Sequence, residues 1–233
     1  MRWTENDGQG RDFTVACAGR DVPGVLWAPQ GGGPFPLVLA GHGFTVHKRA
    51  LYPATLIKDL NSRGFALAAI DAPGHGERQP DGGRDTEASD RAWRAHWREH
   101  GASQIAEEWR ATLDALLALP EIEEPVGYFG LSLGTQYGVG VLAAEPRIRA
   151  AVLGLSALPA PGPRIAAYAS NVSCPVFFIQ QRDDEIAPLD RSNALFAAIA
   201  SADKTFRSSP GGHMDVPRAV FEEAYGFLER HLT

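Results

Sequence analysis

The sequence has little cysteine, no excess of positive charge and no long hydrophobic run. Cys17 and Cys174 are the two cysteines among 233 residues. They are too few for a disulfide framework or a cysteine-based zinc site, so we expect both to be small buried hydrophobic residues. The net charge is −6 and no basic cluster stands out, which argues against nucleic-acid binding. No segment approaches the roughly 20 consecutive apolar residues that a membrane-spanning helix needs.

The N-terminal residues are polar and acidic, without the apolar core or cleavage pattern of a secretory signal. We therefore expect a cytoplasmic protein. Apolar residues make up 44% of the chain and charged residues 21%, which is ordinary for a globular protein. The length suits one large α/β domain, and neither an internal repeat nor a dividing linker is present. We predict a single domain over residues 1–233; the sequence leaves monomer and homodimer open.

Strand-like and helix-like segments alternate through most of the chain. This pattern is typical of βαβ units, so the predicted fold is α/β, with a mostly parallel twisted sheet, helices on both faces and antiparallel N-terminal strands. The expected strands cover residues 12–18, 22–28, 37–40, 65–70, 126–129, 148–155, 176–180 and 204–207, and the expected helices cover 51–63, 105–119, 135–144, 189–199 and 217–232.

A serine between two glycines, Gly130-Leu-Ser132-Leu-Gly134, follows an apolar strand and precedes a predicted helix. The pattern G-x-S-x-G at a strand-to-helix turn is that of a nucleophile elbow, which exposes the serine hydroxyl at the edge of the sheet. The glycines are needed because side chains at those two positions would strike neighbouring backbone. Ser132 is therefore the candidate nucleophile.

A serine nucleophile needs a histidine base and an acid that orients the histidine. With this type of elbow the order along the chain is serine, acid, histidine. His213 lies in the loop before the last helix and fits the base, whereas His231 closes that helix. The loop after strand 176–180 carries three acids; we choose Asp184, with Asp183 as the alternative.

The oxyanion hole of such a site takes one backbone N–H from the residue after the serine and one from the loop after the first core strand. These are Leu133 and, within Gly41-His-Gly-Phe44-Thr, the N–H of Phe44. We expect His42 to organise this loop by hydrogen bonding and to lie close enough to contact substrate. It precedes Ser132, which is the wrong order for the base.

Residues 77–103 break the alternation with a polar, charged and aromatic stretch. Trp93 and Trp97 are spaced i, i+4 and so share one helical face. The stretch is interpreted either as a small lid over the site, with the two tryptophans contacting substrate, or as a surface helix docked by them. His96 and His100 have the same spacing, but no carboxylate completes a metal site, so we predict no metal and no cofactor.

Taken together, these motifs resemble the α/β-hydrolase superfamily along nearly the whole chain. His42-Gly-Phe-Thr45 is similar to the oxyanion loop of feruloyl esterases, and Asp71-Ala-Pro-Gly-His-Gly-Glu-Arg78 is similar to the segment that follows the next strand in the family. The resemblance includes small bacterial carboxylesterases and dienelactone-hydrolase-like proteins. Dienelactone hydrolases carry a cysteine where this chain has Ser132, and dehalogenases and epoxide hydrolases carry an aspartate. The short segment 156–173 leaves little room for a cap domain there.

The resemblance implies a serine carboxylesterase that cleaves small or medium esters, with aromatic groups favoured by Phe44, Trp93 and Trp97. A thioesterase, a lactonase or a small peptidase would use the same residues. A non-catalytic hydrolase-fold protein that binds a small molecule is the alternative of another class. The expected partner is a small-molecule ester, with neither nucleic acid nor membrane involved.

Overall fold

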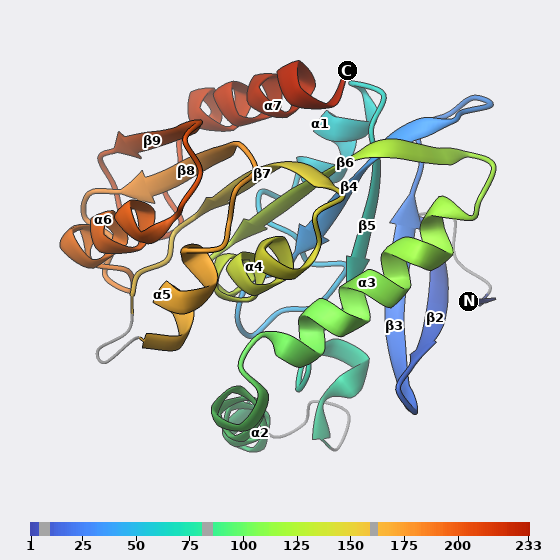
Figure 1. Cartoon of the computed structure of the whole chain (residues 1–233), viewed down its shortest axis with the longest axis horizontal. Coiled ribbons are helices and arrows are strands. Elements are labelled where there is room, and N and C mark those ends of the chain that lie inside the picture. The colour runs from blue at the N-terminus through green and yellow to red at the C-terminus, as the bar shows by residue number, and fades with distance from the viewer. Residues whose placement is uncertain (5–9, 81–85, 159–162) are drawn as a thin grey trace.

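The computed structural model describes residues 1–4, 10–80, 86–158 and 163–233. The described residues form one nine-stranded sheet in the order β1-β2-β3-β5-β4-β6-β7-β8-β9 (Figure 1). Strands β4 to β9 are parallel, whereas β1, β2 and β3 run antiparallel along one edge. The strands are β1 (Arg2–Trp3), β2 (Arg11–Cys17), β3 (Arg20–Trp27), β4 (Phe35–Gly41), β5 (Ala66–Ile70), β6 (Ile122–Leu131), β7 (Ile148–Gly154), β8 (Val176–Gln181) and β9 (Lys204–Ser209).

Helices cover both faces of this sheet. The first face carries α3, α4, α5 and α6, and the opposite face carries α1 and α7 (Figure 1). The predicted α/β fold with antiparallel N-terminal strands is therefore confirmed. The helices are α1 (Leu56–Asn61), α2 (Thr86–His100), α3 (Ser103–Leu117), α4 (Leu133–Ala144), α5 (Pro163–Ala169), α6 (Leu189–Ala198) and α7 (Arg218–Leu232), and a 3-10 turn, η1, covers Gly76–Arg78.

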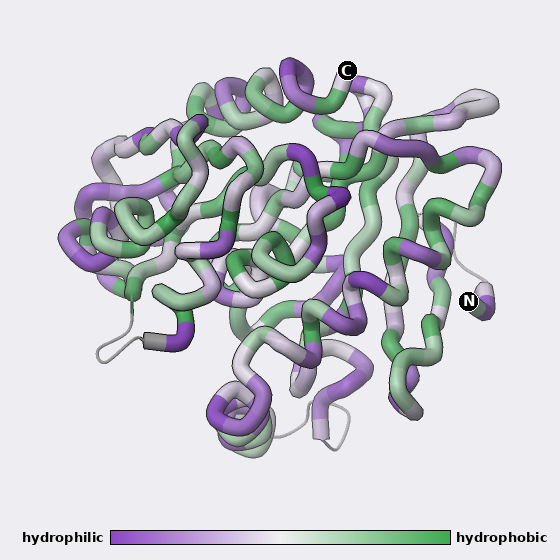
Figure 2. The backbone as a smooth tube through the Cα atoms, in the orientation of Figure 1, coloured by the Kyte–Doolittle hydropathy of each residue, from purple (hydrophilic) through white to green (hydrophobic). Residues whose placement is uncertain are grey.

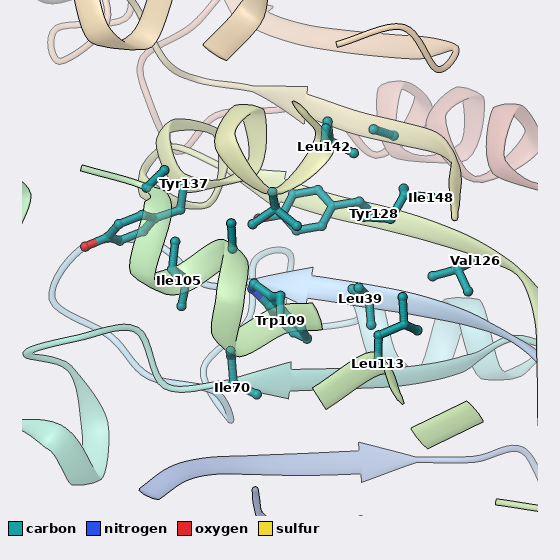
Figure 3. Packing of buried hydrophobic residues seen from close by; sticks show 14 of the residues in the cluster. Leu39, Ile70, Ile105, Trp109, Leu113, Val126, Tyr128, Tyr137, Leu142 and Ile148 are labelled. Carbon is teal, nitrogen blue, oxygen red and sulfur yellow. The ribbon is translucent and has the colours of Figure 1, made fainter. Parts of the chain in front are cut away.

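Alternation along the central strands divides the hydrophobic residues between two cores. In β4, Leu37 and Leu39 face the α3 and α4 side, whereas Val38 and Ala40 face α7. The period of two residues follows from the pleat, and burial on both faces makes the strand continuously apolar. Figure 3 shows Leu39 and Tyr128 of the sheet packed against Trp109 and Leu113. In Figure 2, α7 alternates between hydrophilic and hydrophobic residues, as a helix with one packed face does.

Several elements differ from the sequence-based expectation: β1 was not expected, β6 begins at Ile122, before the expected strand 126–129, and two helical segments differ as follows. The helix expected over residues 51–63 covers only Leu56–Asn61; Pro53 accounts for the absence of helix at Tyr52, because a proline disfavours helical geometry at the residue before it. The segment 156–173, expected as a connection, contains α5, whose Ile165 and Ala169 lie one helical turn apart and are both buried. The seven residues of α5 make only about two turns, which is too short a stretch to show a clear helical period.

The cysteines are only partly as expected. Cys17 is buried in β2, whereas Cys174 is half-buried before β8. Burial raises the pKa of both thiols, to about 11 for Cys174, so both are held as unreactive thiols near neutral pH. Across the described ranges, no helix is long and apolar enough to cross a bilayer.

Candidate active site

Ser132 stands at the turn between β6 and α4. Its backbone has φ +58°, a left-handed conformation that is strained for a residue with a side chain. A Cβ on Gly130 would lie 2.7 Å from the carbonyl oxygen of Gly134, and a Cβ on Gly134 would lie 2.5 Å from that of Gly41. Both glycines are therefore required, and the Ser132 side chain is placed at the carboxyl edge of the sheet.

The structure brings His213 and Asp184 to this serine from two later loops. His213 Nε2 lies 3.2 Å from Ser132 Oγ, and His213 Nδ1 lies 2.8 and 2.9 Å from the carboxylate oxygens of Asp184. The carboxylate of Asp184 is fully buried, and its Oδ1 also accepts the N–H groups of Ile186 and Ala187 at 2.9 and 2.7 Å. With Nδ1–H donating to Asp184, Nε2 is free to accept the serine proton.

The three acids of the loop after β8 have three different partners. Asp184 meets the His213 ring, Asp183 accepts the N–H of Gly211 at 3.0 Å, and Glu185 accepts the N–H of His213 at 3.0 Å. Asp183 therefore holds the backbone of the histidine loop and does not meet the ring. Sequence reasoning missed Glu185 as a contact of His213, because nothing in the spacing distinguishes a loop acid that binds a backbone N–H from a solvated one.

Thr135 is a second residue that sequence reasoning missed. Its fully buried hydroxyl lies 2.8 Å from the carbonyl oxygen of Gly130 and accepts the N–H of Gly154 at 2.7 Å. The carbonyl oxygen of Gly154 in turn accepts the N–H of Ser132 at 2.9 Å. Thr135 thus links the end of β6 and the start of α4 to the end of β7. These hydrogen bonds hold the turn at Ser132 in its strained conformation.

The loop expected to supply an oxyanion donor begins beside the elbow. Gly41, the last residue of β4, pairs in register with Gly130 of β6, so the residues that follow, including Phe44, enter the region next to Ser132. Leu133 is the first residue of α4, and the N–H groups of a helix's first turn have no partner within the helix. Both predicted donors therefore belong to backbone at the same edge of the sheet.

The side chain of His42 connects that loop to the segment after β5 by hydrogen bonds. The Ala72 N–H donates to His42 Nε2 at 3.0 Å, and His42 Nδ1 bonds the Gly43 carbonyl at 2.7 Å. The side chain is 3% exposed, and burial lowers the pKa of His42 to about 4, so the ring is neutral. Both ring nitrogens are engaged, which supports the loop-organising role and argues against the predicted contact with substrate.

A buried ion pair joins the loop that carries Phe44 to Glu77, the first residue of the segment 77–103. The carboxylate of Asp71 accepts the backbone N–H of Lys48 at 2.8 Å, its Nζ at 3.1 Å and the N–H of Glu77 at 3.0 Å. Lys48 Nζ also bonds the Glu77 carboxylate. Because the charged groups of Lys48 and Asp71 are both buried, separating them would be energetically costly. The loop and the start of the segment 77–103 are therefore held together.

The two tryptophans of α2 dock it onto the site. Trp93 meets the ring of Phe44 edge-on with centroids 5.0 Å apart, and Trp97 meets Tyr137 of α4 at 5.2 Å. Arg164 Nη1 closes the far end of α2 by donating to the Trp97 carbonyl at 2.7 Å. The predicted segment 77–103 thus covers the Phe44 loop, although its residues 81–85 lie outside the described residues.

Within the described residues, no group of three or more His, Cys, Asp or Glu side chains is arranged to hold an ion. His96 and His100 lie with ring centroids 5.0 Å apart, and His96 Nδ1 faces the Tyr137 hydroxyl at 3.5 Å.

Comparisons with known proteins point to one family. The model of the alpha/beta hydrolase family matches residues 37–232. A cold-adapted esterase from an Arctic intertidal metagenomic library, solved with PEG, is 36% identical with a TM-score of 0.88, and each chain is fully covered. A native structure of a cold-adapted esterase from such a library is 31% identical, with a TM-score of 0.80 and full coverage of both chains. Est1E from Butyrivibrio proteoclasticus with ferulic acid bound shares the fold at 18% identity, with a TM-score of 0.73 over 94% of this chain and 98% of that one. No curated protein matches.

Proposed function

Because this chain belongs to the alpha/beta hydrolase family, we propose that it is a serine carboxylesterase with Ser132, His213 and Asp184 as its catalytic triad. One observation carries the proposal: the continuous hydrogen-bond path from Ser132 Oγ through both ring nitrogens of His213 to the buried carboxylate of Asp184. This is the arrangement that turns an ordinary serine hydroxyl into a nucleophile.

The reaction proceeds through an acyl-enzyme. Ser132 Oγ attacks the ester carbonyl while His213 Nε2 takes its proton, and Asp184 stabilises the imidazolium that forms. The N–H groups of Phe44 and Leu133 then bind the oxyanion; such a donor is typically worth about 10²–10³ in rate. His213 passes the proton to the departing alcohol, and a water activated by His213 releases the acid. No step needs a metal or a cofactor.

The acyl half of the substrate lies on the Phe44 side of the site in this proposal. Trp93 packs edge-on against the Phe44 ring, and Trp97 stacks on Trp93 and contacts the buried ring of Tyr137. We expect the half-buried rings of this cluster to favour aromatic or short hydrophobic acyl groups, which pack on rings edge-on or offset. Residues 77–103 then act as a small lid on the acyl side.

The direct test compares Ser132→Ala with Ser156→Ala on short p-nitrophenyl esters. Ser156 follows the neighbouring strand β7, and its hydroxyl has no hydrogen-bond partner within the described ranges, so it is the matched control. Loss of turnover in Ser132→Ala alone, with a serine-directed phosphonate attached to Ser132 in the wild type, would support the proposal.

Retained turnover in Ser132→Ala, with no label on that serine, would refute the triad. Tight binding of esters without turnover would favour a non-catalytic binding protein. A parallel panel of thioesters, lactones and peptides ranks the other substrates that the same triad can cleave.

A further inference from the structure

Two large apolar side chains are exposed on the loops that carry Asp184 and His213. Ile186, two residues after Asp184, is 65% exposed, and Met214, directly after His213, is 61% exposed. The other exposed large apolar residues of the described chain, Met1 and Trp3, are at the N-terminus. Single exposed apolar residues are normal, but here they flank both members of the proposed acid–base pair.

Hydrogen bonds fix the backbone at both of these residues. The Ile186 N–H donates to Asp184 Oδ1 at 2.9 Å, and the Met214 carbonyl accepts the hydroxyl of Tyr52 at 2.6 Å. Tyr52 belongs to the connection between β4 and α1, which also carries Phe44. The exposed side chains therefore sit on loops fixed to the site.

Three carboxylates surround the same loop. They bind three consecutive backbone amides: Asp183 binds Gly211 at 3.0 Å, Asp215 binds Gly212 at 2.8 Å, and Glu185 binds the N–H of His213 at 3.0 Å. All three acids are exposed. Backbone hydrogen bonds lower the pKa of Glu185, so it is charged at neutral pH. Arg182 is the single cation in the two segments 180–188 and 210–217.

The chemistry says which half of an ester meets these residues. The departing alcohol oxygen must take its proton from His213 Nε2, so it has to lie within hydrogen-bond reach of that atom. The oxyanion donors Phe44 and Leu133 belong to other elements. The alcohol half is therefore the part directed toward the loops around His213. We name Ile186, Met214, Asp183, Glu185 and Asp215 the alcohol-side rim.

We propose that the alcohol-side rim binds the alcohol half of the substrate and selects alcohols that are hydrophobic and carry no negative charge. Ile186 and Met214 supply apolar contact, and the three carboxylates repel an anionic alcohol. The inference rests on the proposed esterase function and adds the class of leaving group. We expect the three negative charges to lower kcat/KM for an anionic alcohol by on the order of tenfold, because each like charge about 10 Å away in water-like surroundings adds a small repulsion.

The hydrophobic part is tested with acetate esters of alcohols from methanol to hexanol. The readout is kcat/KM, since it includes departure of the alcohol, whereas kcat can be set by the acetyl-enzyme that all these esters share. We expect kcat/KM to rise with each added methylene, by up to about fourfold for full burial. The double variant Ile186→Asn, Met214→Gln flattens this rise, while Trp3→Gln, an exposed apolar residue of β1, leaves it intact.

A series of p-nitrophenyl esters with lengthening acyl chains is the internal control, because its dependence on chain length is set on the Phe44 side and should survive the double variant. A wild-type rate independent of alcohol length, or a rise that the double variant does not reduce, overturns the hydrophobic part.

The charge part compares 4-carboxyphenyl acetate with 4-carbamoylphenyl acetate, which is neutral and also electron-withdrawing. We expect kcat/KM to be lower for the anionic ester than for the neutral one. The difference in kcat/KM should become smaller at high salt and in the variant Glu185→Gln, Asp215→Asn. The ratio of kcat/KM for the two esters is compared within each variant, because a displacement of His213 would change both rates alike and leave the ratio unchanged. Equal rates in the wild type overturn the charge part. If the wild type cleaves no ester and is not labelled by the phosphonate, the proposed esterase function is refuted, and not only the role of the alcohol-side rim.

Discussion

Replacing Asp184 by asparagine tests the acid assignment most sharply, because the structure fixes how the new amide would be oriented. Oδ1 accepts two backbone N–H groups, from Ile186 and Ala187, so the amide oxygen of the new side chain takes that place and its NH₂ group replaces Oδ2. That NH₂ would stand 2.8 Å from His213 Nδ1, whereas the amide oxygen, 2.9 Å from Nδ1, is already bonded to the two backbone N–H groups. A donor there favours the tautomer with the proton on Nε2, which cannot accept a proton from Ser132.

The expected loss in Asp184→Asn is about 10⁴ in kcat, as for the equivalent change in serine proteases, which corresponds to about 5 kcal/mol of transition-state stabilisation. KM should change little, since ester binding does not involve the acid. The matched control is Asp183→Asn, whose amide oxygen can still accept the Gly211 N–H, so its loss should stay below about tenfold because a neutral acceptor replaces a charged one.

The assay is steady-state hydrolysis of p-nitrophenyl acetate, with thermal unfolding to show that both variants are folded. The pH profile of kcat/KM is a second readout. A purely structural defect would lower kcat/KM by the same factor at every pH, whereas the wrong tautomer of His213 would also change the shape of the profile. A larger loss in Asp183→Asn than in Asp184→Asn would refute the assignment drawn from the hydrogen-bond geometry.

Three further outcomes follow from the same contacts. Thr135→Val leaves the buried N–H of Gly154 without its acceptor and should lower the free energy of unfolding by about 1–3 kcal/mol and slow phosphonate labelling; Thr135→Ser should restore both, and an unchanged labelling rate in the valine variant would contradict its positioning role. Burial lowers the pKa of His42 to about 4, so its contribution to stability is complete above its unfolded pKa near 6.5 and is lost as pH falls toward 4, by up to about 3 kcal/mol; chemical denaturation of wild type and His42→Gln across this range should show a weaker pH dependence in the variant. Trp93→Ala removes the ring that covers Phe44 and should raise KM for aromatic acyl esters more than for acetate; equal effects on the two would exclude an acyl-side role for α2.

Local patterns were sufficient for the framework. The continuous apolar run in β4 predicts a buried strand, and the helical period in α3 indicates which of its side chains face a core; both signals come from neighbouring residues. The G-x-S-x-G spacing is equally local as a pattern, although the clash that excludes a side chain at Gly134 is with Gly41 of the neighbouring strand β4. Where local signals conflict or are weak the expectations differ from the structure, as in the helix that begins after Pro53 and in the short helix α5.

The order of residues along the chain determined the candidates Ser132 and His213, because chain order in a parallel sheet dictates which loops reach the same edge. The choice between Asp183 and Asp184 was decided only by tertiary structure: adjacent loop residues point in different directions, and only the packed loops show that Asp184 meets the imidazole while Asp183 meets a backbone amide. The role of Thr135 and the internal position of His42 have the same origin. Hydrogen-bond partners more than a few residues apart are set by how strands and loops pack, and sequence spacing does not encode that packing.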